Sequence, residues 1–437
     1  MPTLEQLPGP RSPRVFNTLE FALAPRRFAL RHAQKYGRVY RMRALQAEVV
    51  ITADPEHVRR VFAADSDAFS SFSGLALRAL FGPRSVLITS GPVHKHQRKL
   101  LAPPLHGARL RAFGATMQAL ADRHVATLAE GQEFRALELT TNFTLDVIVQ
   151  TVFGVTAEVE AAELREVLQA MVHHIPPIAL FVPRLQTRWF RPWARYIKTR
   201  ERFNNWVANK IEQQKRAATL GSDVLSLLLA ARYDDGSEMD ESEIRDQLIT
   251  LLLAGHETTS IALASCMSRL ARHPEVLARL RSELDAHPLS DDVQRLPYLS
   301  AVIDETLRID PVVSDIARVP NVDFALDDGL TVTPKQLLLV LMEALHHDPV
   351  LYPAPHEFRP ERFLERKFAP HEFAPFGGGV RRCLGAAFSD YETKIMLATL
   401  VRRLELAPAR KQPDRRVRRN ITMGPKNGVP LRVVKLR

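Results

Sequence analysis

The chain has 437 residues, of which 46% are hydrophobic and 25% are charged. This balance is typical of a folded globular protein rather than a disordered one. Its two cysteines, Cys266 and Cys383, exclude a disulfide framework and a four-cysteine zinc site. The net charge of +11 would suit an anionic partner, but the basic residues are spread along the whole chain. With no motif to support such binding, we expect no nucleic-acid partner.

The ends of the chain and its most apolar run carry no sign of a membrane protein. Met1–Pro10 is polar and contains three prolines, so it does not resemble a signal peptide. Leu248–Ala254 is far shorter than the roughly 20 residues that span a bilayer. We therefore expect a cytoplasmic protein without a membrane anchor.

Near the C-terminus, the dense basic run Arg410–Arg419 contains no aromatic residue and predicts a solvated loop.

Helical patterns dominate from about Pro55 onward, where apolar residues recur at three- and four-residue spacing. Short strand-like pieces lie before and after these helices, and no strand–helix alternation supports a parallel doubly wound sheet. The sequence therefore predicts a mainly α fold with small β-sheets (α+β). The clearest elements, in chain order, are strands at Val39–Arg43 and Val49–Thr52, helices at Leu110–Leu128, Ala194–Lys215 and Pro274–Ala286, and strands at Val319–Phe324, Leu337–Leu341 and Leu431–Leu436.

One predicted helix, Asp240–Arg272, is much longer than the usual mean of about 11–12 residues. Asp240 and Glu243 resemble a capping box at its start. Its middle is apolar nearly all round, which is typical of a helix through the centre of a large core. That middle nevertheless contains Gly255 and Glu257, and both residue types are costly inside a buried helix. We predict a functional segment; the alternative is a polar network that only kinks the helix.

The most informative stretch is Phe373–Gly385, which contains three consecutive glycines. Glycines permit positive φ angles and let backbone approach a ligand closely. Cys383 lies just before a helical pattern, Ala386–Arg402, so free N–H groups and the helix dipole favour its thiolate. The neighbouring cations Arg381 and Arg382 act in the same direction. The stretch is suited to keeping a sulfur deprotonated.

Three uses of such a thiolate compete: a nucleophile, a redox thiol and a metal ligand. A nucleophile would need a histidine base, and the stretch contains none. A redox thiol would need a second cysteine, but Cys266 lies in the apolar helix, where we expect an inert core residue. A single ligand to haem iron fits best, because haem takes one protein cysteine on one side.

The stretch around Cys383 also matches a known pattern. It resembles the haem-binding loop of the cytochrome P450 monooxygenases at the defining positions Phe376, Gly379, Arg381, Cys383 and Gly385. Three further motifs resemble those of the family and occur in its order: Ala254–Thr259, Glu305–Arg308 and Pro360–Phe363. The resemblance implies one large helical domain, residues 1–437, with a long central helix and a haem b cofactor. It replaces the three domains that chain length alone suggests.

The resemblance implies which residues hold the haem. Cys383 would be the axial thiolate ligand of the iron, and Gly377 and Gly385 would let backbone N–H groups point at its sulfur. Phe376 would shield that face of the ring. The two haem propionates need cations in a mostly apolar pocket, and the residues at the matching positions are His94, Arg98, Arg318 and Arg381.

On the opposite side of the haem, the resemblance assigns the long helix to oxygen activation. Ala254 and Gly255 would make room for O₂, because the glycine would let the helix bulge. Glu257 and Thr258 would be the catalytic acid–alcohol pair that delivers protons, and burial would raise the pKa of Glu257. His256 would be only a neighbour.

Glu305 and Arg308 lie three residues apart, so they share one helix face. Taken alone they predict a surface ion pair worth about 0–1 kcal/mol. The resemblance instead implies that both pair with Arg362 in a buried structural triad behind the haem loop.

The implied function is a haem-thiolate monooxygenase that uses O₂ and two electrons to hydroxylate an organic substrate. Two alternatives remain: a peroxide-driven haem peroxygenase, which Glu257 and Thr258 disfavour, and a haem protein that only binds gas or carries electrons. No charged cluster is evident for anchoring a phosphate or sugar, so we expect an apolar substrate such as a terpenoid, steroid or fatty acid. Its pocket is predicted to be lined by Phe69–Ile88, Met171–Phe190 and Val312–Ala317.

Electrons must come from a separate protein, because no segment resembles a flavin or iron–sulfur domain. An acidic ferredoxin or flavodoxin, with its reductase, would be steered to a basic face on the cysteine side of the haem. We expect the chain itself to be a monomer. The predicted docking residues are Lys95, Lys99, Arg109, Arg111, Arg382 and Lys394.

Overall fold

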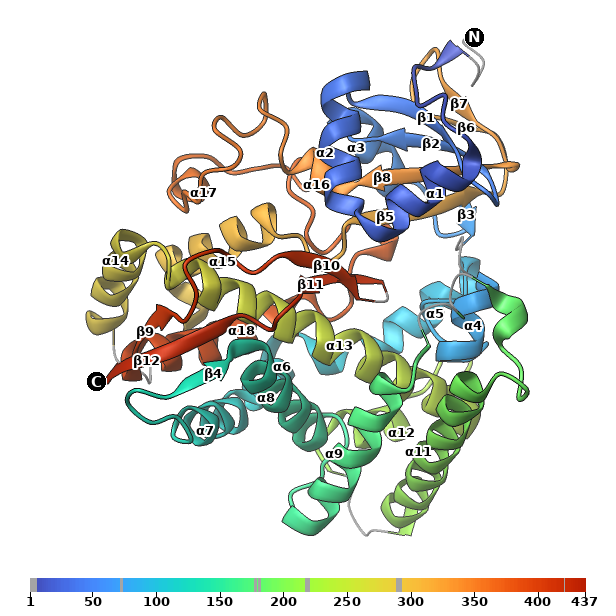
Figure 1. Ribbon diagram of the computed structural model, residues 1–437. Coiled ribbons are helices and arrows are strands. Elements are labelled where there is room, and N and C mark those ends of the chain that lie inside the picture. Colours follow the sequence, from blue (N-terminus) through green and yellow to red (C-terminus); the bar gives the residue numbers. More distant parts are fainter. Residues whose placement is uncertain are drawn as a thin grey trace.

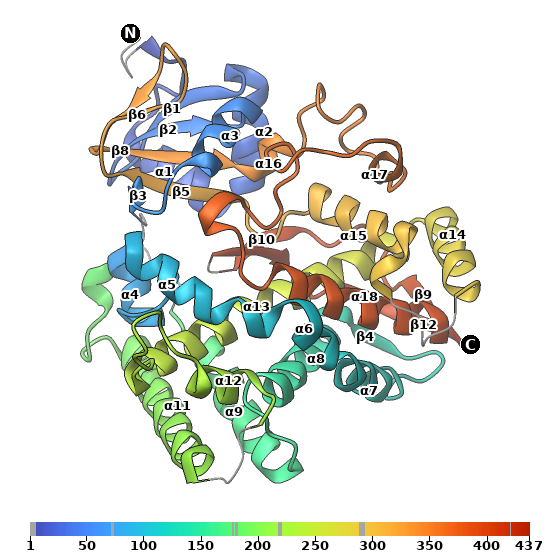
Figure 2. The same ribbon diagram turned by 180° about the vertical axis from the view of Figure 1, so that it is seen from behind.

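Two hydrophobic cores organise the chain, a large one among helices and a smaller one around a five-stranded sheet. The computed structural model describes residues 6–70, 74–176, 179, 182–216, 221–287, 293–419 and 421–437. In Figures 1 and 2 the sheet forms the upper part of the molecule and most of the helices form the lower part.

The described elements are mainly helical, as the sequence predicts. The helices are α1 Arg14–Leu23, α2 Pro25–Tyr36, α3 Pro55–Ala63, α4 Gly74–Phe81, α5 Gly91–Leu101, α6 Gly107–Ala112, α7 Gly114–Val125, α8 Ala136–Thr151, α9 Glu158–His173, α11 Arg191–Arg216, α12 Val224–Ala230, α13 Glu241–Leu270, α14 Pro274–Asp285, α15 Pro297–Ile309, α16 Met342–Leu345, α17 Arg362–Glu365 and α18 Ala386–Arg403. The strands are β1 Val39–Arg43, β2 Glu48–Thr52, β3 Phe69–Ser70, β4 Glu133–Arg135, β5 Asp315–Pro320, β6 Phe324–Ala325, β7 Thr331–Val332, β8 Gln336–Leu341, β9 Leu404–Pro408, β10 Arg416–Arg419, β11 Thr422–Pro425 and β12 Pro430–Leu436.

The five-stranded sheet has the order β1-β2-β8-β5-β3, so it joins strands near the N-terminus to two strands within residues 315–341. β1 and β2 form the predicted antiparallel hairpin, and β2 then pairs in parallel with β8. The strand predicted at Val319–Phe324 is misplaced: β5 already begins at Asp315 and ends at Pro320. A strand is present as predicted, but its bounds differ from the prediction. They are set by antiparallel pairing with β8, which the local sequence pattern does not reveal.

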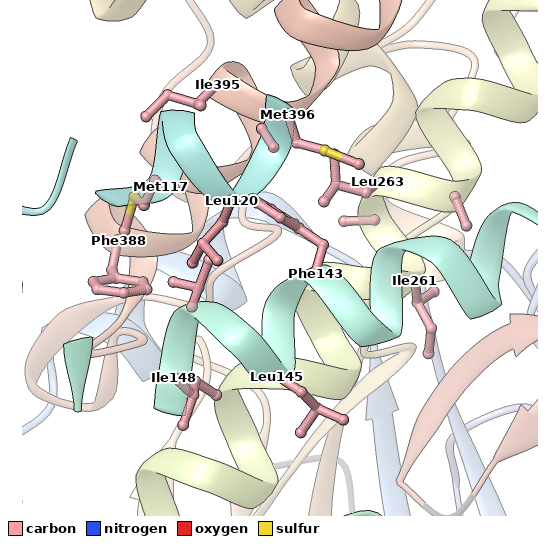
Figure 3. Close-up of a cluster of buried hydrophobic side chains, with 14 of the residues drawn as sticks. Met117, Leu120, Phe143, Leu145, Ile148, Ile261, Leu263, Phe388, Ile395 and Met396 are labelled. Carbon is pink, nitrogen blue, oxygen red and sulfur yellow. The ribbon is translucent and has the colours of Figure 1, made fainter. Parts of the chain in front are cut away.

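Helix α13 crosses the centre of the large core. It begins after Asp240, whose side chain accepts a hydrogen bond from the backbone N–H of Glu243 at 2.9 Å, as the capping box predicts. Helices α8 and α18 pack against it, and α7 packs against both of them. Figure 3 shows apolar side chains of these helices gathered in one cluster. By length and composition α13 could cross a membrane, but 67% of its most apolar window is buried inside the protein. We therefore interpret it as a core helix.

The basic run near the C-terminus is not a solvated loop from Arg416 onward. Arg416–Arg419 forms β10, which pairs with β11. Arg416 lies 3.4 Å from Asp310, and Arg418 lies 3.3 Å from Asp315. The prediction was wrong because the acidic partners lie about a hundred residues earlier in the chain, where no local pattern reveals them.

A buried ion-pair network links α15 to the start of α17 and to the segment before it. Both side-chain oxygens of Glu305 accept hydrogen bonds from Arg308, at 2.7 and 2.8 Å, and one also accepts from Arg362 Nε at 3.0 Å. The side chains of Glu305 and Arg308 are fully buried, and that of Arg362 is 3% exposed. Arg308 also donates to three backbone carbonyls, those of His346, Pro355 and Glu357.

Glu305→Ala should strongly reduce the yield of folded protein. Two buried guanidinium groups would lose their shared carboxylate, and removing one partner of a buried pair costs about 3–5 kcal/mol. A matched control is Arg359→Ala, which removes an exposed pair to Glu365 at 3.0 Å and should cost about 0–1 kcal/mol. Soluble yield and the free energy of unfolding in denaturant measure both effects. Equal stability of the two variants would show that the triad is not structural.

Candidate active site

The cysteine loop, Phe373–Gly385, folds back on itself just before α18. The backbone N–H of Cys383 donates to the carbonyl of Phe376 at 2.8 Å. Gly377 and Gly379 have φ angles of +64° and +62°, which other residues rarely adopt. At these two positions the backbone therefore requires glycine, as the sequence predicts.

Two of the three consecutive glycines leave room for α3. A Cβ on Gly378 would lie 2.1 Å from the ring of Phe62, and a Cβ on Gly379 would lie 1.8 Å from the Phe62 carbonyl oxygen. No side chain larger than hydrogen fits at either position unless α3 moves. Sequence analysis missed Phe62, since nothing in its local pattern marks it as the neighbour of a loop more than 300 residues away.

The two cysteines lie in different surroundings. The thiol of Cys383 is exposed, and that of Cys266 is buried. Burial raises the pKa of Cys266 to about 12. Neighbouring atoms also desolvate Cys383 and raise its pKa, but the backbone N–H of Gly385 and the cations Arg382 and Arg98 oppose that shift. Cys383 is thus the accessible thiol, but the amide and the cations only partly offset the desolvation, so its pKa stays above that of a free thiol and the loop alone does not favour the thiolate as the sequence predicts.

Four basic side chains converge beside the loop without an acidic partner. Among the described residues, Arg98 on α5, Arg318 on β5 and Arg381 in the loop form no ion pair. Burial and Arg381 lower the pKa of Arg318 to about 10. Burial, followed by these three arginines, lowers the pKa of His94 to about 3, so its ring is neutral. A cluster of partly buried, mutually repelling cations is suited to an anionic ligand.

Two further observations fit an anionic ligand at this cluster. His94 Nδ1 is buried and has no hydrogen-bond partner among the described residues. Asp65 lines a small cavity together with Arg318 and Arg381. Its carboxylate lies 3.2 Å from Lys95 and pairs with that lysine, so it does not neutralise the two arginines. Arg381 is fixed by the carbonyls of the segment before α5, including Thr89 O at 2.7 Å. The predicted propionate contacts are therefore brought together, although none was adjacent in sequence.

On α13, the predicted acid–alcohol segment faces the start of α18. Ser389 Oγ, one turn after the cysteine loop, lies 3.0 Å from Thr259 Oγ1 and donates to it. Thr258 Oγ1 donates to the carbonyl of Ala254 at 2.7 Å. The expected bulge at Gly255 is absent from this fully described helix: α13 stays α-helical throughout, and Thr259 Oγ1 bonds the Gly255 carbonyl at 2.9 Å.

Glu257 and its neighbour His256 differ sharply in environment. Burial raises the pKa of Glu257, while Arg419 and a hydrogen bond from Thr422 lower it. Its side chain is 20% exposed, so the carboxyl lies near solvent. His256 is buried, its Nδ1 lies 2.9 Å from the Leu252 carbonyl, and burial lowers its pKa. Sequence analysis missed Arg419 because it treated the basic run that ends at this residue as a loop, and nothing marked Thr422, which follows the run.

The described residues contain no group of three or more His, Cys, Asp or Glu side chains that could hold a metal ion. A metal at Cys383 would therefore need a cofactor to supply most of its ligands. The sequence profile of the family named Cytochrome P450 matches residues 7–431. The chain belongs to the cytochrome P450 family.

Curated relatives are bacterial P450s of similar length. Putative cytochrome P450 138 of Mycobacterium bovis and Mycobacterium tuberculosis is 33% identical over 438 residues, covering 98% of this chain and 96% of the relative. Putative cytochrome P450 137 of Mycobacterium tuberculosis is 34% identical over 436 residues, covering 98% and 90%. This P450 is accordingly a monooxygenase with a haem-thiolate cofactor.

Solved structures confirm the P450 fold, mainly helical with small sheets. Retinoic acid-bound cyanobacterial CYP120A1 superposes with a TM-score of 0.86 at 24% identity, covering 96% of each chain. The P450DA haem domain gives 0.85 at 24% identity, covering 98% of this chain and 97% of the other. The unpaired cations, the orphaned His94 nitrogen and the exposed thiol fit a haem with two propionates.

Gly379→Ala should abolish incorporation of haem, because its Cβ would collide with backbone of α3. The matched control is Gly107→Ala: Gly107 has a nearly equal φ of +61°, but a Cβ there would meet nothing within 4 Å. The control should lose only about 1–2 kcal/mol from the left-handed backbone and should keep its haem. The ratio of haem to protein measures the difference. Equal haem content in the two variants would contradict the close packing described.

Proposed function

We propose that this P450 hydroxylates an apolar organic substrate, with Cys383 as the axial thiolate ligand and electrons from a separate protein. The observation that carries the proposal is the placement of an accessible thiol, unpaired cations and the α13 acid–alcohol segment around the cysteine loop. Haem bound through a thiolate supplies O–O cleavage chemistry. The protein's own residues hold the cofactor, exclude water and supply protons.

His94, Arg98, Arg318 and Arg381 would bind the haem propionates. Three of them are permanent cations, and each would gain an anion that the described residues do not provide. His94 would act differently, since its neutral ring donates a hydrogen bond rather than a charge. Phe376 is partly buried against the large core beside the loop, a position that supports its proposed role of shielding the thiolate.

Glu257 and Thr258 would deliver protons on the α13 side. Glu257 has a carboxyl near solvent whose pKa burial raises, so it retains a proton more readily than a free glutamate. The Thr258 hydroxyl donates to Ala254 O and can turn to donate or accept elsewhere. This pair supports O₂-driven turnover over peroxide-driven oxidation, and over a protein that only binds gas or carries electrons.

An apolar substrate is supported by the described parts of the predicted pocket. Phe81 and Val86, in the stretch 69–88, and Val312, after α15, are buried. Residues 71–73, 177, 178, 180 and 181 of the predicted lining lie outside the described residues. A spin-state shift screen against small terpenoids, steroids and fatty acids would identify the class.

The proposed electron donor is an acidic ferredoxin or flavodoxin that docks on the cysteine side, in the cytoplasm. The structure narrows the predicted docking residues. Lys95 pairs with Asp65 and Lys99 with Asp234, while the side chain of Lys394 is only 7% exposed and lies 3.0 Å from Asp390. The remaining candidates are exposed and form no ion pair among the described residues: Arg109, Arg111 and Arg382.

Thr258→Ala should divert electrons to hydrogen peroxide, and Glu257→Gln should slow turnover, because a positioned acid contributes about 10²–10⁴-fold. The control is Thr259→Ala, which removes the adjacent threonine that bonds Ser389 and should keep native coupling. One reconstituted assay with a surrogate donor would measure NADH used, peroxide formed and product formed. If Glu257→Gln and Thr258→Ala both match the wild type, protons arrive by another route.

Arg111→Glu should slow reduction by an acidic donor at low salt, and the effect should shrink as salt screens it. The same charge reversal at Arg216, at the far end of α11, is the control and should leave the rate unchanged. Stopped-flow reduction of the ferric protein measures both. Identical rates for the two variants would remove Arg111 from the docking face.

A further inference from the structure

The C-terminal hairpin β10–β11 lies against α13 (Figure 1). It reaches the helix at Glu257, beside Arg419. Arg419 Nε is 3.9 Å from Glu257 Oε1, and Thr422 of the same hairpin also lowers the pKa of the carboxyl. The side chains of Arg419 and Glu257 are 42% and 20% exposed. The carboxyl is thus held where the interior of the helix meets solvent, by a segment about 160 residues later in the chain.

The hairpin that carries Arg419 is itself anchored. Thr422 Oγ1 donates to the carbonyl of Arg419 at 2.8 Å and closes the turn. Contacts to the segment after α15 fix both strands: Met423 N–H donates to Val312 O at 2.7 Å, and Arg416 and Arg418 lie 3.4 and 3.3 Å from Asp310 and Asp315. The backbone of Arg419 therefore has a fixed position relative to the helices.

Gly424 makes the approach of Arg419 possible. A Cβ on Gly424 would lie 2.7 Å from Arg419 Cδ and 3.2 Å from Ile261 Cδ1. Ile261 lies one helical turn after Glu257 on α13, so the arginine stem runs through the gap between the hairpin and this face of the helix. A methyl group at position 424 would push the guanidinium away from the carboxyl without removing its charge.

We propose that Arg419 is a positioning residue that anchors the Glu257 carboxyl at the solvent end of the proton path. This inference rests on the proposed role of Glu257 in proton delivery. Arg419 acts through Glu257, since it restrains the carboxyl and favours its charged form, which lets the group release a proton inward and recover one from solvent.

The other polar groups near Glu257 do not share this role, because neither of them carries a charge. His256, the preceding residue of α13, is turned toward Leu252 O and is neutral. Thr422 contributes a hydrogen bond but no charge. Within the described part of the chain, no other charged group on the elements packed against α13 contributes to the pKa of Glu257. Removing Arg419 should therefore raise that pKa.

The test is an infrared pH titration of the ferric holoprotein at rest, without substrate or electron donor. The protonated-carboxyl band of Glu257 is isolated by subtracting the spectrum of the matching Glu257→Gln protein. Arg419→Gln should move the titration midpoint upward by about one pH unit, the lower end of the effect of a cation on a carboxylate. Arg419→Lys should restore much of the wild-type midpoint, and Gly424→Ala should shift it upward although it keeps the arginine.

The control is Arg415→Gln, an exposed arginine just before β10, and its midpoint should equal that of the wild type. In turnover, activity falls as Glu257 loses its proton, so the alkaline limb of NADH oxidation should shift to higher pH in Arg419→Gln. Equal midpoints in wild type and Arg419→Gln, or an equal shift in Arg415→Gln, would overturn the inference. Because the titration needs no turnover, it separates this failure from a failure of the proposed role of Glu257.

Discussion

A single buried carboxylate, that of Glu305, fixes the relation between the helical core and the cysteine loop. It binds two arginines, and Arg308 then bonds the His346 carbonyl at 2.7 Å. The ring of His346 accepts the backbone N–H of Ala374 at 3.1 Å, at the start of the loop. Burial and Arg308 lower the pKa of His346 to about 3, so the ring stays neutral and able to accept. An unbroken chain of contacts thus runs from α15 to the cysteine loop.

The protein places its arginines in two contrasting electrostatic environments. Around Glu305 and Asp310, arginines meet carboxylates and backbone carbonyls, so buried charge is compensated within the protein. Around the cysteine loop, Arg98, Arg318 and Arg381 meet no carboxylate among the described residues, and burial, followed by a neighbouring arginine, lowers the pKa of each. The first arrangement stabilises the fold, and the second leaves a deficit of negative charge that a cofactor with two carboxylates would fill.

Local sequence patterns predicted those features that depend on residues close to one another in the chain. The cap at Asp240, the pairing of Glu305 with Arg308 and the glycine-rich bend before Cys383 each depend on residues within a few positions of one another. Helix type followed from periodicity for the same reason, although the helix predicted at Leu110–Leu128 is divided between α6 and α7. The family resemblance then supplied the partners that local reasoning could not.

The parts that sequence reasoning missed depend on distant partners. Lys95 and Lys99 looked free, but Asp65 and Asp234 bind them. Gly255 was expected to bulge the helix, yet hydroxyl groups bond the helix carbonyls and the regular backbone persists. Arg419 belonged to a run that predicted a loop, although it lies beside Glu257. For the two lysines and Arg419 the deciding neighbour comes from another element, whereas for Gly255 it lies in the same helix.

The central claim is that Cys383 binds haem iron as a thiolate, and the absorption spectrum of the ferrous–CO complex tests it most directly. We expect freshly purified wild-type protein to show the strongly red-shifted band of thiolate ligation. Cys266→Ser, which changes the buried cysteine, should keep this band, and Cys383→His should lose it. A globin-like band in folded wild-type protein, or a red-shifted band that survives Cys383→His, would contradict the claim.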